Sequence, residues 1–458
     1  MPSNPRAVVL LALVVASANV VSGSSDPDLS TGLAKVEWFM ATSDTAAAIS
    51  DAASAATRLL VQLTTARAAM RQVADVDLLP PVRAFAAKDA ASLKELVPQY
   101  WEGRGVRPLA ASYTGPHNAF IAVRTDIPAP QQFPLLLHEY THLLTEAHVP
   151  DAPGWLNEGL ADFWGALVLE AGQMRVGRPP AQHLKLLRTR PWLSLAEMRD
   201  RPSGKLATTQ AQASMFYAQS WATVHYLLLG RNPAAPLTFA PSERELTPQL
   251  EAAVRAYATE GQFREVPIQS TPDVNVGSGI LVRRPVHRSL GEGGSPGEGG
   301  SRTGLQPISE ARALAERANM LVFGERPDAA LPMARRALSL DSREPLALEV
   351  MGTHAFLHNQ PDHAREWLSK ALDADPQRYS SALYLALLSS SPPDRERYLR
   401  SALRAKQDSV VAWQHLWALY GEDGRAAQAR RWCRQLSGLT QPFLWTAASL
   451  PCDWRGVP

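Results

Sequence analysis

The sequence predicts an α+β domain that is followed by an all-α domain of repeated helical hairpins. Short β-rich segments alternate with longer helical patterns up to residue 285, and a repeat of 34 residues follows a Gly- and Ser-rich segment. The length of 458 residues and the hydrophobic content of 45% suit a globular protein of two or three domains. Because the net charge is only +2, the composition gives no electrostatic case for nucleic-acid binding.

Residues 1–18 have the features of a secretory signal peptide. Arg6 precedes an apolar run from Ala7 to Ala16, and Ala16-Ser17-Ala18 offers a small-x-small cleavage site. The run is too short to span a bilayer comfortably. We therefore expect export to a bacterial periplasm or the extracellular space, with no membrane span left after cleavage. An uncleaved anchor is the alternative.

Strands and helices are expected to alternate before residue 125. The pattern predicts strands at 34–41, 81–86 and 118–124. It predicts helices at 44–72, capped by Ser43 or Asp44, and at 88–97, with Asp89 near the start. These elements would supply the small sheet and part of the helices of the α+β domain.

The sequence His138-Glu139-Tyr140-Thr141-His142 places two imidazoles one turn apart on a helix. Residues four apart on a helix are neighbours, so the rings of His138 and His142 can converge on one metal ion. Glu139 would then lie beside the ion, where a carboxylate can take the proton of an attacking water. Apolar residues lead into this segment, and Pro134 suits the first turn of the helix.

A second segment, Trp155-Leu156-Asn157-Glu158-Gly159-Leu160-Ala161-Asp162-Phe163, offers a carboxylate for the same ion. Glu158 follows His142 with fifteen residues between them, and two histidines plus a carboxylate form a known catalytic zinc arrangement. Asp162 lies one turn beyond Glu158, where it can accept the outer N–H of a ligating imidazole. Residues 149–154 read as a turn, so the second helix can fold back against the first.

These two segments, HEYTH and WLNEGLADF, resemble the gluzincin metallopeptidases, in particular the peptidase MA-like bacterial domains with an NExxAD motif. The resemblance implies a zincin-like domain over residues 34–285 that acts on a peptide or protein substrate. It also implies that the zinc ligands are His138, His142 and Glu158. Glu139 would be the general base, and Asp162 would be the carboxylate that orients a ligating imidazole. The spacing of the motifs is shorter than in thermolysin-like members and looks like that of other peptidase MA-like domains. In gluzincins the strand before the metal helix forms the edge of the cleft; here residues 119–123 fit an ordinary buried strand equally well.

Tyr217 lies in a helical stretch downstream of the two motifs. The resemblance implies that a tyrosine here stabilises the oxyanion of the transition state. The alternative is a packing role, because Phe216 and Trp221 make this helix rich in core residues. His225 and Tyr226 are weaker candidates, and each is better explained as a helix residue with satisfied hydrogen bonds.

The rest of the first domain and the connection to the second carry no chemistry that the sequence identifies. Residues 208–229 and 247–259 read as helices, and residues 266–285 have extended character. A Gly- and Ser-rich linker is expected at 286–306.

The chain then repeats itself over residues 307–440. Ala337-Leu338-Ser339-Leu340-Asp341 recurs 34 residues later as Ala371-Leu372-Asp373-Ala374-Asp375. This resembles the tetratricopeptide repeat, whose paired helices form a groove for a peptide or protein partner. The array could instead be a structural cap on the first domain. A C-terminal tail is expected at residues 441–458. It contains Cys452, which could form a disulfide with Cys433 in an oxidising compartment. The alternative is that both cysteines stay as buried thiols.

The sequence therefore predicts an exported zinc-dependent metallopeptidase, a hydrolase with Zn²⁺ as its cofactor. Its catalytic residues would be Glu139 and, from the resemblance, Tyr217. One alternative is a non-catalytic scaffold that uses the helical array to bind a partner. The other is a zinc hydrolase of non-peptide amides such as cell-wall linkages, which the same atoms would serve.

Overall fold

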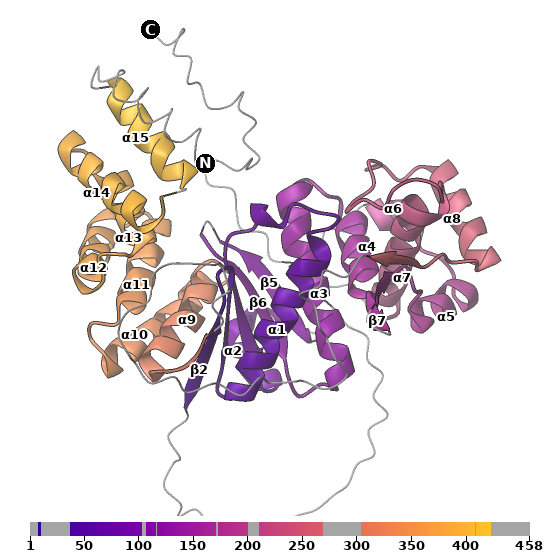
Figure 1. Ribbon diagram of the computed structural model, residues 1–458, viewed down its shortest axis with the longest axis horizontal. Helices are drawn as coiled ribbons and strands as arrows, with labels where there is room; N and C mark the ends of the chain where they lie inside the picture. The colour runs from indigo at the N-terminus through magenta and orange to yellow at the C-terminus, as the bar shows by residue number, and fades with distance from the viewer. Residues whose placement is uncertain are drawn as a thin grey trace, which may run out of the picture.

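The computed structural model describes residues 8–10, 37–102, 107–115, 117–170, 173–199, 210–268, 304–407 and 409–422. This part of the chain is a mixed α/β structure, in which a seven-stranded sheet lies at the centre and groups of helices lie to either side (Figure 1). Most of the expected signal peptide, most of the expected linker and both cysteines lie outside these residues. None of the described helices is long and apolar enough to cross a membrane.

The central sheet has the strand order β1-β5-β6-β4-β3-β2-β10. Its strands are β1 (Val8–Leu10), β2 (Trp38–Thr42), β3 (Ala46–Ser50), β4 (Val82–Ala87), β5 (Ala110–Thr114), β6 (Ala119–Arg124) and β10 (Gly304–Ile308). β3, β4 and β6 pair in parallel, and the remaining pairs are antiparallel. The parallel strands have almost continuously apolar sequences because both of their faces are covered.

The prediction of one helix over residues 44–72 is wrong in its first part. Residues Ala46–Ser50 form β3, and the helix α1 spans only Ala53–Met70. Alanine favours helices, but β3 is hydrogen-bonded on one side to β2 and on the other to β4, and this pairing outweighs local propensity. The residue that caps α1 is consequently Ala52, and neither Ser43 nor Asp44 does so.

The other elements predicted before residue 125 are present. β2, β4 and β6 lie where strands are expected, and α2 (Ala90–Leu96) lies within the predicted helix 88–97. Asp89 caps α2, because its carboxylate accepts the Ser92 N–H at 2.7 Å. Two short 3₁₀ turns, η1 (Val76–Leu78) and η2 (Pro98–Trp101), complete this region.

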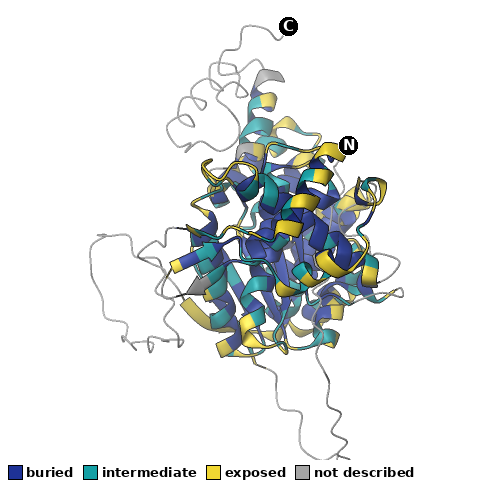
Figure 2. Cartoon of the chain, turned by 90° about the vertical axis from the view of Figure 1, so that its right-hand side faces the viewer, coloured by how far each residue is buried: buried dark blue, intermediate teal, exposed yellow. Residues whose placement is uncertain are grey.

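β6 lies in the interior of the sheet, between β4 and β5. The expectation that this strand forms the edge of a cleft is therefore wrong, and the alternative of an ordinary buried strand is correct. Its alternate residues enter two hydrophobic cores. Ile121 joins the core that includes α1 and α3 (Ala129–His148), and Phe120 joins the core of α2 and the C-terminal helices. The burial pattern in Figure 2 shows the interior that results, with exposed residues on the outer faces of the helices.

The helices α3 and α4 (Gly154–Gly165) carry the predicted metal-binding residues. α3 begins at Ala129, so Pro134 lies inside this helix and not in its first turn. The predicted turn between the two helices is present, and α4 packs against both α3 and α7 (Gln210–His225). Around them lie α5 (Ala181–Thr189), α6 (Leu195–Arg199), a π-helical turn (Tyr226–Gly230), α8 (Pro248–Glu260) and a small sheet of β7 (Val168–Glu170), β8 (Gln173–Val176) and β9 (Val266–Ile268).

After β10 the chain forms helices that pack in consecutive pairs. They are α9 (Glu310–Val322), α10 (Ala330–Leu340), α11 (Pro345–Leu357), α12 (Pro361–Ala374), α13 (Tyr379–Leu388), α14 (Pro392–Ala405) and α15 (Val410–Glu422), with a 3₁₀ turn, η4 (Pro327–Ala329), before α10. Alternate helices begin at residues 310, 345, 379 and 410, in keeping with the repeat in the sequence. The assignment to the tetratricopeptide family stays a prediction.

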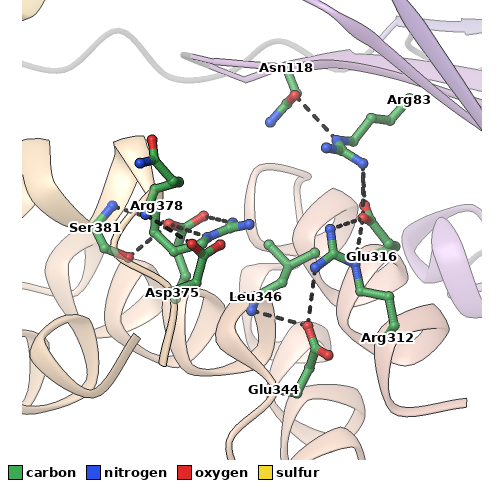
Figure 3. A network of polar contacts seen from close by, with 11 residues as sticks. Arg83, Asn118, Arg312, Glu316, Glu344, Leu346, Asp375, Arg378 and Ser381 are labelled. Carbon is green, nitrogen blue, oxygen red and sulfur yellow. Dashed lines mark hydrogen bonds and ion pairs between the residues drawn. The ribbon is translucent and has the colours of Figure 1, made fainter. Parts of the chain in front are cut away.

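The helical array is attached to the central sheet at two places. Residues 304–306 of the expected linker are part of β10, which pairs with β2 at one edge of the sheet. On the α2 face of the sheet, Arg83 of β4 donates to the fully buried Glu316 of α9, at 2.8 Å. Arg312 donates to the same carboxylate at 2.8 Å and reaches Glu344 at 3.3 Å (Figure 3). The start of the array thus completes the core of the sheet.

Candidate metal centre

His138 and His142 lie one turn apart on α3, as predicted, and both rings are buried. Their centroids are 4.6 Å apart with an angle of 76° between the ring planes. The two Nε2 atoms face each other at 2.9 Å. The sheet on one side of α3 and α4 on the other exclude solvent from this pair.

Glu158 on α4 points toward the same two nitrogens. Its Oε2 lies 3.7 Å from His138 Nε2 and 3.6 Å from His142 Nε2. The three side chains are buried, and their ligand atoms all lie within 4.8 Å of one another. The structure therefore brings together the three residues predicted as ligands, and this group can hold a metal ion.

The outer nitrogens of both rings are anchored by acceptors. His138 Nδ1 lies 3.0 Å from Asp162 Oδ1, and His142 Nδ1 lies 3.0 Å from Asn157 Oδ1. Each Nδ1 must carry a proton to donate to these oxygens, so each neutral ring presents a lone pair at Nε2. Two lone pairs and a carboxylate oxygen then converge on one point, and such an arrangement needs a positive charge between them.

Without a metal ion that charge is a proton on one ring. Burial alone would lower the pKa of His138, but Asp162 and Glu158 outweigh it and raise this pKa to about 9. Burial and the charge on His138 together lower the pKa of His142 well below its ordinary value. A divalent cation would take the place of the shared proton, so the chemistry of the donor set fits a metal ion.

Asp162 is held by two histidines. Its Oδ1 bonds to His138, and its Oδ2 lies 2.9 Å from His183 Nε2 on α5. Burial acts to raise the pKa of Asp162, but the hydrogen bonds from His138 and His183 lower it far below the ordinary value of a carboxyl group. Asp162 therefore stays ionised and fixes the orientation of His138, as predicted for an orienting carboxylate.

Glu139 lies beside the two histidines on α3 and is fully buried. Its Oε2 accepts a hydrogen bond from Ser112 Oγ of β5 at 2.7 Å. Glu139 does not belong to the metal-capable group, although its charge contributes to the raised pKa of His138. The carboxylate is therefore beside the cation position and not on it, as predicted for a base.

Tyr217 of α7 lines a cavity of about 480 Å³ together with His138, Asp162 and His183. Apolar side chains form much of the remaining wall, including Leu135, Leu167, Val168 and Leu186. Glu139, His142 and Glu158 are not among the residues that line it. Tyr217 and His138 therefore line the same cavity.

His225, a weaker candidate, has a structural role. Its Nε2 lies 2.9 Å from the Gly177 carbonyl oxygen, and its Nδ1 lies 2.9 Å from the Tyr257 hydroxyl. Burial lowers the pKa of His225 to about 4, so the ring is neutral at pH 7. Tyr226 begins the π-helical turn and packs against Tyr257.

Three residues of the centre were not predicted from the sequence: Ser112, Asn157 and His183. Asn157 precedes Glu158 directly, and this position on the same helix was the one available signal. Ser112 and His183 reach the centre from β5 and α5, and no local pattern relates either residue to the motifs on α3 and α4. Contacts of this kind become visible only when the elements are placed in space.

Comparisons with known proteins do not assign the chain to a family. The chain matches no protein-family model, and a comparison with curated proteins also gives no match. What the centre does must follow from its own residues.

Proposed function

We propose that the protein is an exported zinc-dependent metallopeptidase. The observation that carries the proposal is the buried convergence of His138, His142 and Glu158, with both imidazoles held in the tautomer that a metal requires. Two imidazoles and a carboxylate are ligands that zinc accepts in catalytic sites, where a fourth position is left for water. Tetrahedral zinc keeps such ligand atoms about 3.3 Å apart, close to the separations from Glu158 to either ring.

When bound, zinc would polarise the substrate carbonyl and lower the pKa of a water molecule. Glu139 would take the proton of an attacking water and return it to the leaving amine. The hydrogen bond from Ser112 holds the Glu139 carboxylate toward β5. Asp162 and Asn157 keep the imidazoles in place, so the centre needs little rearrangement during the reaction.

The position of β5 supports a peptide as the substrate. β5 carries Ser112, and its outer neighbour in the sheet is β1, which belongs to the expected signal peptide. Cleavage after Ala18 would remove β1 and leave β5 as an edge strand beside Glu139. An extended peptide can add to such an edge through main-chain hydrogen bonds.

The decisive experiment compares Glu139→Gln with the wild type. We expect Glu139→Gln to retain one equivalent of zinc at this centre and to lose hydrolysis of casein or peptides. Glu158→Ala should lose both the zinc and the activity. Glu146→Gln, which makes the same chemical change further along α3, serves as the control and should remain active. Undiminished turnover by Glu139→Gln would refute the assigned base.

Tyr217 is the proposed donor to the oxyanion. Loss of such a donor costs about 10²- to 10³-fold in kcat, so Tyr217→Phe should lower kcat by this amount. A variant with unchanged kcat would assign Tyr217 to packing against Phe216 and the cavity wall.

A further inference from the structure

A second group of metal-ligating side chains lies in the helical array. It consists of Asp328 in η4, His354 on α11 and His358 directly after the end of α11, and its ligand atoms all lie within 4.8 Å of one another. The two histidines are four residues apart, so they project from one face of the helix one turn apart. No part of the proposed peptidase mechanism uses them.

The geometry directs both histidines at the same carboxylate oxygen. Asp328 Oδ1 lies 2.7 Å from His354 Nε2 and 3.6 Å from His358 Nε2. The two rings are stacked, with centroids 4.0 Å apart and only 17° between their planes. The two Nε2 atoms and the carboxylate oxygen are therefore three candidate ligand atoms for one ion.

The tautomer of His358 is fixed by its own helix. Its Nδ1 lies 2.9 Å from the His354 carbonyl oxygen, which only accepts hydrogen bonds, so Nδ1 carries the proton. In the neutral ring, Nε2 then presents a lone pair toward Asp328, 3.6 Å away. A nitrogen lone pair and a carboxylate oxygen repel each other unless a cation lies between them. The separation is close to the distance of about 3.3 Å between two ligands of a tetrahedral zinc ion.

Protonation of a ring would be the other way to supply this charge. The resulting ion pair would be weak, because Asp328 is 79% exposed and ion pairs at the protein surface contribute little. A metal ion can engage all three ligand atoms at once, whereas a single proton joins only His354 and Asp328, which are 2.7 Å apart.

We propose that Asp328, His354 and His358 form a second site for a divalent transition-metal ion of the Zn²⁺ type. Two imidazoles and one carboxylate suit zinc, nickel or copper and do not suit Mg²⁺ or Ca²⁺, which prefer oxygen ligands. The ion would connect the turn between α9 and α10 to the C-terminal end of α11, and so join two successive helical pairs. Because Asp328 and His358 are exposed, this site binds more weakly than the buried centre on α3 and α4.

The test measures zinc binding to the full-length, metal-free protein by isothermal titration calorimetry. We expect a weaker binding event that His358→Gln removes and Asp328→Asn weakens at least tenfold. His363→Gln is the matched control, because His363 is an exposed histidine on the neighbouring helix α12 and does not belong to the group. It should bind as the wild type does. Mg²⁺ should give no heat at this site.

A thermal melt of each variant, with and without Zn²⁺, shows whether the variants fold and whether the ion stabilises the array. Zinc should raise the melting temperature of a Glu158→Ala protein, in which only the second site is intact, and should not raise that of Glu158→Ala combined with His358→Gln. Zinc binding that is identical in the wild type, His358→Gln and Asp328→Asn would overturn the proposal. The result does not depend on whether the α3–α4 centre is a peptidase site.

Discussion

At the scale of single residues, the contact between Ser112 and Glu139 is the one that the proposed mechanism depends on most directly. Ser112→Ala removes a hydrogen bond to a buried carboxylate, and such bonds contribute about 1.5–3 kcal/mol. We expect a comparable loss in the free energy of unfolding from urea melts. We also expect kcat to fall about tenfold or more, because the base loses the group that holds it.

Ser220→Ala is the matched control for this change. Ser220 is also buried, but its hydroxyl has no hydrogen-bond partner among the described residues. The control should keep its stability within about 0.5 kcal/mol of the wild type. Equal effects of the two substitutions would show that the Ser112 hydroxyl contributes nothing specific to Glu139.

The residues that come together at the candidate metal centre were largely predictable from the sequence, because they are local to two helices. The spacing of His138 and His142 and the pairing of Glu158 with Asp162 follow from helix geometry, and the structure places all four as expected. Their chemical roles stay predictions. His183 could not be predicted, since it comes from a separate helix and its contact with Asp162 depends on how α5 packs.

At the scale of secondary-structure elements, Gly159 sets how closely α4 approaches α7. A Cβ atom at Gly159 would lie 2.5 Å from the Ser220 carbonyl oxygen and 2.7 Å from Val224. Gly159→Ala must therefore push the two helices apart, at an expected cost of about 1–3 kcal/mol. Because Glu158 directly precedes Gly159, the affinity for zinc should fall as well, as equilibrium dialysis would show.

Gly324→Ala provides the comparison for Gly159. A Cβ atom there would meet its nearest neighbour, the Leu321 carbonyl oxygen, at 3.4 Å, which is ordinary contact. We expect little change in stability or zinc affinity. A Gly159→Ala protein as stable as Gly324→Ala would mean that α4 and α7 can separate freely.

The elements that were predicted wrongly are those whose secondary structure or position in the sheet depends on tertiary contacts. Residues Ala46–Ser50 have the composition of a helix and become a strand because β2 and β4 pair with them. The position of β6 inside the sheet depends on β5, a strand that was not among those predicted from the sequence. Local patterns identify elements, whereas their order in the sheet comes from long-range pairing.

At the scale of the whole molecule, Glu316 links the helical array to the sheet. Burial raises the pKa of Glu316, but the charges of Arg83 and Arg312 outweigh it and hold this pKa below its ordinary value of 4.5. A carboxyl group with a lowered pKa stabilises the folded state above the pKa of the unfolded chain. That stability is lost as the pH falls from about 4.5 through the folded-state pKa.

Glu316→Gln should therefore destabilise the protein by about 1.5–3 kcal/mol at pH 7, since the partly buried Arg83 and Arg312 lose the charged carboxylate that they share. The free energy of unfolding of this variant should change less between pH 5 and pH 3 than that of the wild type. Glu310→Gln, an exposed change at the start of the same helix, should alter neither quantity appreciably. A wild-type acid response in Glu316→Gln would contradict the assigned linkage.

The hydrophobic core that the sheet shares with the helical array leads to a second prediction about the whole molecule. Phe85, Tyr113 and Phe120 pack in the same core as helices of the array. A chain that ends after residue 268 would expose these aromatic side chains, so we expect it to aggregate when expressed. Size-exclusion chromatography checks this, and a monomeric, folded product would show that the first domain folds without the array.

The pairing of β10 with β2 also determines when the protein can finish folding. Thr42 and its partner Gly304 are 262 residues apart, and a ribosome that adds about 5–20 residues each second needs roughly 13–50 s to make the intervening chain. Throughout that interval β2 has an unsatisfied edge in the nascent polypeptide. A holding chaperone, or a translocation machinery that keeps the emerging segment extended, would protect it until translation has passed residue 308.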